Sequence, residues 1–236
     1  MNRRLATQDC AACGMNSCES TGEPNGRFEG CPMTYRGDVL KRAFDVYEND
    51  RELKEFARAA ARVEATGYMR WTRVEDTMEF AHEMGYRTLG IASCVGLKRE
   101  AAILESILKD NGFSVVSAIC KTGGVPKEKI GLRDDEKVNP GGFEAMCNPV
   151  AQAMLLDEAG SELSVVLGLC VGHDSLFYKT SRAPVTTLVA KDRVLGHNPV
   201  AALYNHQSYY KQKLRHEHLR GVTTSKPSRK KQDKEA

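Results

Sequence analysis

The sequence predicts an α/β fold: an open parallel sheet of about four strands flanked by helices, in three layers as in Rossmann-like and flavodoxin-like domains. The first observation is a set of four short apolar runs, at residues 87–93, 114–119, 163–169 and 184–190. Each run is continuous rather than alternating, as expected for strands covered on both faces. Helical patterns separate the runs, and strands that alternate with helices form parallel sheets.

Helical spacing of apolar residues places helices between and after these strands, at residues 97–111, 148–159, 174–180 and 198–204. Upstream, residues 38–65 are predicted to form two helices, and Asp50 caps the second. Thr72 caps the next helix together with Glu75, three residues on, in a capping box. Gly85 ends that helix.

The composition divides the chain into three parts. Residues 1–36 are rich in Cys, Gly, Asn and Pro and poor in aliphatic side chains, so we expect a Cys-rich metal-binding head. Residues 37–210 form the α/β domain with a helical lead-in, and residues 211–236 form a basic tail that we expect to be disordered. From His206 onward, nine Lys and Arg against three acidic residues give a net charge of +6, so the preceding residues sum to −3.

The overall composition is that of a globular protein, and we expect it in the cytoplasm. No stretch approaches the roughly 20 apolar residues of a membrane-spanning helix, so no membrane association is expected. The positive charges of Arg3 and Arg4 are not followed by the apolar run of a secretory signal. Thiols stay reduced in the cytoplasm, so the 8 cysteines of the chain point to metal binding or redox chemistry.

The first four cysteines are spaced as metal ligands. Cys10 and Cys13 form a CxxC pair, and Cys18 and Cys31 complete a set of four within 22 residues. A CxxC turn brings two thiolates to one metal, and the other two close the site. A Cys followed by Pro, here Cys31-Pro32, is familiar from iron–sulfur ligand runs, whereas structural zinc usually shows two CxxC-like pairs. We therefore favour a [4Fe–4S] cluster and keep zinc as the alternative.

The second four cysteines lie where the predicted strands and helices meet. Cys94, Cys120 and Cys170 follow the first three strands, and Cys147 precedes the helix at residue 148. Ligands of open parallel sheets bind beyond the carboxyl ends of the strands, so a strand order of 2-1-3-4 would gather these residues at one edge. We expect a second metal, cluster or reactive-thiol site there; the alternative is that each cysteine is a small apolar residue packed at a strand end.

Two further residues belong to this predicted edge. His173 lies at the start of a helix, three residues after Cys170, and could be a ligand, an acid/base group or a cap. Lys121 follows Cys120 in a Gly-rich stretch and could bind an anion together with the backbone; a plain loop is the alternative. The sequence contains no GxxxxGK[ST], GxGxxG, GxSxG or HExxH motif, which disfavours a P-loop NTPase, a standard dinucleotide dehydrogenase or an α/β-hydrolase.

The chain resembles an uncharacterised family of cytoplasmic predicted metal-binding proteins with a Cys-rich N-terminus, known only as a domain of unknown function. The resemblance lies in the head up to Cys31-Pro32 and in residues 70–75, 90–97, 137–140, 147–149, 168–174 and 195–199. It covers about residues 10–210 and leaves the basic tail outside. The resemblance implies a metal but no reaction or substrate.

These observations lead to two main hypotheses. The first is an iron–sulfur redox protein with an electron-transfer partner or a small anionic substrate, in which Cys94, Cys170 and His173 are the catalytic candidates and Lys121 holds the anion. The second is a structural-zinc head whose α/β body binds a small ligand or partner without catalysis. Nucleic-acid binding through the basic tail is disfavoured, because the body is slightly acidic and lacks a basic face studded with aromatic residues.

Overall fold

The computed structural model of the chain describes residues 8–24, 26 and 28–215. Most of the predicted basic tail, from residue 216 on, therefore lies outside the described residues. The chain divides into two compact units, Met1–Gly85 and Tyr86–Ala236. The helices of residues 37–85 fall in the first unit together with the Cys-rich segment, and the sheet forms the second.

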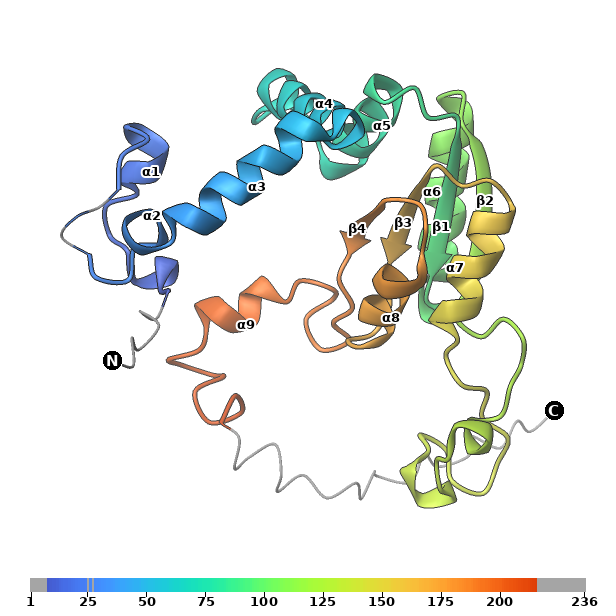
Figure 1. Cartoon of the computed structure of the whole chain (residues 1–236). Helices are drawn as coiled ribbons and strands as arrows, with labels where there is room; N and C mark the ends of the chain where they lie inside the picture. Colours follow the sequence, from blue (N-terminus) through green and yellow to red (C-terminus); the bar gives the residue numbers. More distant parts are fainter. Residues whose placement is uncertain (1–7, 25, 27, 216–236) are drawn as a thin grey trace. The chain divides into compact units, whose positions relative to one another are not determined.

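The first unit is helical (Figure 1). Asp50 accepts a hydrogen bond from the Leu53 amide, and Thr72 and Glu75 form the complete capping box, so both predicted caps are confirmed. The Cys-rich segment contains only short turns of helix. The elements are the 3₁₀ turn η1 (Cys10–Ala12) and the helices α1 (Ser17–Ser20), α2 (Pro32–Tyr35), α3 (Gly37–Asn49), α4 (Arg51–Gly67) and α5 (Arg73–Glu83).

The second unit is built on four parallel strands in the order β2-β1-β3-β4 (Figure 1). The strands are β1 (Thr88–Ser93), β2 (Ser114–Ile119), β3 (Leu163–Leu167) and β4 (Val185–Val189). Each lies within the apolar run that predicted it. The α/β class and the open parallel sheet are confirmed, and so is the strand order on which the predicted site depends.

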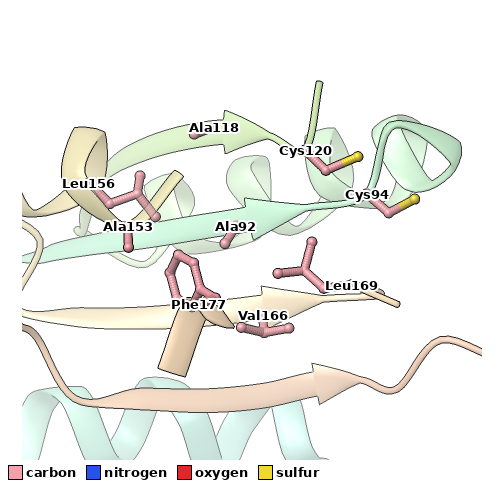
Figure 2. Packing of buried hydrophobic residues seen from close by; sticks show 9 residues of the cluster. All are labelled: Ala92, Cys94, Ala118, Cys120, Ala153, Leu156, Val166, Leu169 and Phe177. Carbon is pink, nitrogen blue, oxygen red and sulfur yellow. The ribbon is translucent and has the colours of Figure 1, made fainter. Parts of the chain in front are cut away.

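A helix lies in each connection between the parallel strands, as in βαβ units. The 3₁₀ turn η2 (Val95–Leu97) and helix α6 (Lys98–Asp110) join β1 to β2, α7 (Pro149–Glu158) joins β2 to β3, and α8 (His173–Thr180) joins β3 to β4. A last helix, α9 (Val200–Tyr204), follows β4. In Figure 2, α6 lies behind the sheet, whereas side chains of α7 and α8 pack on the near face. In the part of the chain described, no helix is long and apolar enough to cross a membrane.

The core of this unit lies between the sheet and the pair α7 and α8 (Figure 2). Phe177 and Leu156 are fully buried there against Ala92 and Val166 of the two central strands. The expectation that all four strands are covered on both faces is wrong for the edges. β2 and β4 are only partly buried, because each has a neighbouring strand on one side only.

The segment between β2 and α7, residues 120–148, folds around a buried lysine. The ammonium of Lys137 is paired with Asp134 at 2.7 Å and Glu128 at 2.8 Å, and it donates to the Gly142 carbonyl at 2.6 Å. Two 3₁₀ turns, η3 (Lys127–Ile130) and η4 (Asp134–Glu136), shape the segment. These contacts return the chain to the sheet edge, where Cys147 lies.

A substitution at Gly90 in β1 tests how closely the side chains around it, including Leu156 of α7, pack on the sheet. A β-carbon at this position would lie 2.6 Å from Ser161 Oγ, 2.9 Å from Ser164 Oγ and 3.1 Å from Leu156 Cδ1, and all three side chains are buried. We expect Gly90→Ala to lower the free energy of unfolding by about 1–3 kcal/mol, measured by urea denaturation. Gly142→Ala is the matched control, because its β-carbon would meet only the Asn139 carbonyl oxygen, at an unstrained 4.0 Å; an equal loss in both variants would contradict the packing argument.

Candidate functional site

The carboxyl edge of the sheet carries four cysteines from four separate segments. The backbone ladder continues past the strands: the Cys94 amide donates to Leu167, and the Cys120 amide donates to Ser93. In Figure 2 the sulfurs of Cys94 and Cys120 project beyond the ends of the neighbouring strands β1 and β2. The predicted edge is therefore formed by the topology. We call Cys94, Cys120, Cys147 and Cys170 the cysteine edge.

Cys120 is the centre of this set. Its side chain is 2% exposed, and its thiol hydrogen-bonds with both Cys94 and Cys147. The hydrogen bonds to these two thiols and burial raise the pKa of Cys120 far above its ordinary value, so it keeps its proton. Its sulfur also accepts the Val95 amide at 3.3 Å. Three thiol groups therefore share a single hydrogen-bonded arrangement.

Cys94 is an acidic thiol. The hydrogen bond from Cys120 is the largest cause that lowers its pKa, to about 5, and it outweighs the opposing effect of burial. The Gly96 amide also donates to the Cys94 sulfur, and the ammonium of Lys191 stabilises the thiolate by charge and by a hydrogen bond. Cys94 is therefore a thiolate at neutral pH.

Cys147 is acidic for a similar reason. The hydrogen bond from Cys120 again contributes most, against burial, and the charges of Lys121 and His173 help to lower its pKa to about 5. The neighbouring thiol therefore contributes most to the acidity of Cys147, which lies just before α7. Lys121 lies beside Cys147 and also donates to the Ala145 carbonyl at 2.6 Å.

Cys170 and His173 occupy the turn between β3 and α8. The Cys170 sulfur accepts a hydrogen bond from Nη2 of Arg193 at 3.1 Å. The backbone amide of His173 donates to the Cys170 carbonyl at 2.9 Å, which fixes the start of α8. Nδ1 of His173 is buried, and no described residue forms a hydrogen bond with it. An imidazole in this state is available to a bound ligand or a proton.

A buried glutamine holds the strand ends beside the cysteine edge in place. Gln152 in α7 is fully buried and donates from Nε2 to the carbonyls of Ser93 and Ala118, at the ends of β1 and β2. Its Oε1 is buried, and no hydrogen-bond partner is described for it. These bonds fix α7 at the strand ends. The backbone amide of Asn148 also donates a hydrogen bond to the Cys120 carbonyl at 2.8 Å.

The head cysteines have a different setting. Cys10 and Cys18 are exposed, Cys13 is partly buried and Cys31 is buried. The described cysteines form no disulfide. Within residues 8–24, 26 and 28–215, no group of three or more Cys, His, Asp and Glu side chains is arranged closely enough to hold a metal ion. Both metal hypotheses therefore remain predictions.

Two cations at the edge were not identified from the sequence. Lys191 and Arg193 come directly after β4, so the rule that located the cysteines at strand ends also applies to them. Gly96 was also not identified as a residue of this edge. A β-carbon there would lie 3.6 Å from Lys191 Nζ and 3.9 Å from Cys94 Sγ. The fourth strand thus supplies positive charge to thiols that follow the first and third strands.

The chain belongs to the DUF1847 family, described as proteins of unknown function, whose model matches residues 31–188. The matched range contains the whole cysteine edge and Cys31, and it begins after the other three head cysteines. The chain is also 45% identical over 177 residues to the uncharacterised protein MJ0455 of Methanocaldococcus jannaschii, covering 75% of this chain and 88% of that protein. The family resemblance drawn from the sequence is confirmed; a metal is not part of either description.

The hydrogen bond from Cys120 gives a pH prediction. Alkylation of Cys147 by iodoacetamide, followed by mass spectrometry in the reduced, chelator-treated chain, is expected to follow the thiolate and fall by half near the pKa of about 5. In Cys120→Ala the donor is lost, so the midpoint moves to higher pH. Cys10→Ala is the control and leaves the midpoint unchanged. A wild-type midpoint at the ordinary thiol value of about 8.5 would refute this account.

Proposed function

We propose that this chain is a metal-binding redox protein whose cysteine edge holds an iron–sulfur cluster, with [4Fe–4S] favoured. The ligands would be Cys94, Cys120, Cys147 and Cys170. Thiolate sulfur is the ligand type that selects iron–sulfur clusters and zinc over hard cations. Such a cluster supplies one-electron transfer when it is bound.

The hydrogen-bonded set of Cys94, Cys120 and Cys147 is the observation that carries this proposal. One proton is held in hydrogen bonds among three sulfurs, and the two outer thiols are already acidic. Metal binding to cysteine releases thiol protons, because the thiolate is the ligand. A soft cation would therefore take the place of a single proton, and only Cys120 among these three would have to ionise on binding.

The surroundings of the edge also suit an anionic metal centre. Four thiolates around a [4Fe–4S]²⁺ core carry a net charge of −2, and reduction adds a further negative charge. Lys121, Lys191 and Arg193 supply positive charge, and the amides of Val95 and Gly96 donate to sulfur. Hydrogen bonds to sulfur and net charge set the reduction potential of such centres. These groups would favour the reduced form.

The remaining roles follow from placement and ligand spacing. The unpartnered Nδ1 of His173 beside Cys147 would carry a proton to or from a bound substrate. The head cysteines, by their spacing, would hold a second centre that exchanges electrons with a partner. That part of the proposal rests on the CxxC pattern and on Cys31-Pro32.

Metal analysis of protein purified without oxygen tests the proposal. We expect a brown protein with absorbance at about 400 nm that contains iron and acid-labile sulfide. Cys94→Ser, Cys120→Ser and Cys147→Ser should each lose the iron of the edge, while Cys10→Ser and Cys18→Ser should lose only the iron of the head. The two sets of variants thus separate the two centres.

The contrary outcomes are equally specific. Colourless protein with stoichiometric zinc, after anaerobic reconstitution has failed, would point to the structural-zinc alternative. Full metal content in all variants of the cysteine edge would remove the edge as a metal site. Ser106→Ala, at an exposed position of α6, is a control that should leave metal content and colour unchanged.

A further inference from the structure

The two cations that follow β4 reach different sulfurs from one short loop. Lys191 acts on the Cys94 thiolate, and Arg193 donates to the Cys170 sulfur. Asp192 lies between them, but its Oδ1 accepts the amides of Val194 and Leu195 at 2.9 and 2.8 Å. The Asp192 carboxylate therefore binds backbone amides of its own loop and does not pair with either cation in these bonds. Both cations instead interact with sulfurs of the cysteine edge.

Arg193 has more donor capacity than its thiol contact uses. A guanidinium carries five N–H donors in a planar fork, and the contact with Cys170 engages Nη2. The side chain is exposed, so it is open to a ligand from solvent. The guanidinium of Arg193 also interacts electrostatically with Cys94 and Cys147. A planar fork beside reactive sulfur is suited to bidentate binding of a carboxylate.

A glycine lies beside both Cys94 and Lys191. Gly96 has no side chain where a β-carbon would stand 3.6 Å from Lys191 Nζ and 3.9 Å from Cys94 Sγ. Lys121 adds positive charge on the side of Cys147. The acid nearest to His173 in sequence, Asp174, accepts the Ser175 amide at 2.7 Å.

We propose that Lys191 and Arg193 bind the carboxylate of a small organic anion and hold it against the cysteine edge. This rests on the proposed function for the chemistry at the sulfurs and adds the class of substrate, a small carboxylate. The competing explanation is that both cations act only as counterions of the thiolates. The two explanations differ in whether an incoming anion gains more from these side chains than a neutral molecule of the same size.

Iodoacetate and iodoacetamide make this comparison directly. Both alkylate a thiolate in the same way: a sulfur–carbon bond forms, the carbon–iodine bond breaks and iodide leaves. Only iodoacetate is a small carboxylate. Their rate ratio at one thiol cancels its thiolate fraction, because both reagents need the same thiolate. The measurement uses the full chain, reduced and treated with chelator, with Cys170 followed by mass spectrometry.

We expect the iodoacetate-to-iodoacetamide ratio to be higher at Cys170 than at the exposed head residues Cys10 and Cys18, which serve as internal references. Arg193→Gln should lower the ratio at Cys170 by about two- to fivefold, and Lys191→Gln should lower it further in the double variant. Arg193→Lys keeps the charge without the fork and should give an intermediate ratio. Lys179→Gln, an exposed cation in the last turn of α8, should leave it unchanged.

An equal ratio at Cys170 and at the head cysteines overturns the inference. So does a fall in both rates together in Arg193→Gln, which is the result expected of a counterion. Metal content is measured on the untreated protein and reports on the proposed function separately. A protein without iron can still show the anion preference, and an iron protein can lack it.

Discussion

The parallel arrangement of the four strands is the constraint on which the candidate site depends. All four strands point the same way, so the residues that follow them meet at one edge even though they are far apart in the sequence. The crossover from β1 goes to one side of the sheet and the next crossover goes to the other. The strand order therefore switches direction between β1 and β3, the place where ligands of such sheets bind. Cys94 and Cys170 follow those two strands, and β4 adds its two cations beside them.

The second requirement is that the long segment after Cys120 brings the chain back to the carboxyl edge of the sheet at Cys147. The buried ammonium of Lys137 organises this segment through its ion pairs with Asp134 and Glu128. The segment closes with the Met146 amide on Val125 and the Asn148 amide on Cys120. Cys120 and Cys147 are thereby neighbours across 26 intervening residues.

The sequence could predict the fold in most particulars, because strands, crossover helices and caps leave local signals. Asp50 and the Thr72–Glu75 box are examples of caps defined by a few adjacent residues. The gathering of the cysteines followed from the strand order, which is a property of the whole sheet. Their protonation could not be predicted, since it depends on which thiol donates to which. Lys191 and Arg193 carry no local signal, because isolated cations are common in loops, although the strand-end rule applies to both.

The hydrogen bonds of Cys120 also limit what the edge can do in each state. With its proton, Cys120 stabilises two thiolates and is itself a poor nucleophile. Without it, three thiolates would stand together, and their mutual repulsion must be offset by a cation. Lys191 and Lys121 lie at the outer thiols, whereas Cys120 has the Val95 amide and the two sulfurs as neighbours. In that state the balancing charge would come from a bound cation, and the soft metal proposed for the edge is a chemical match.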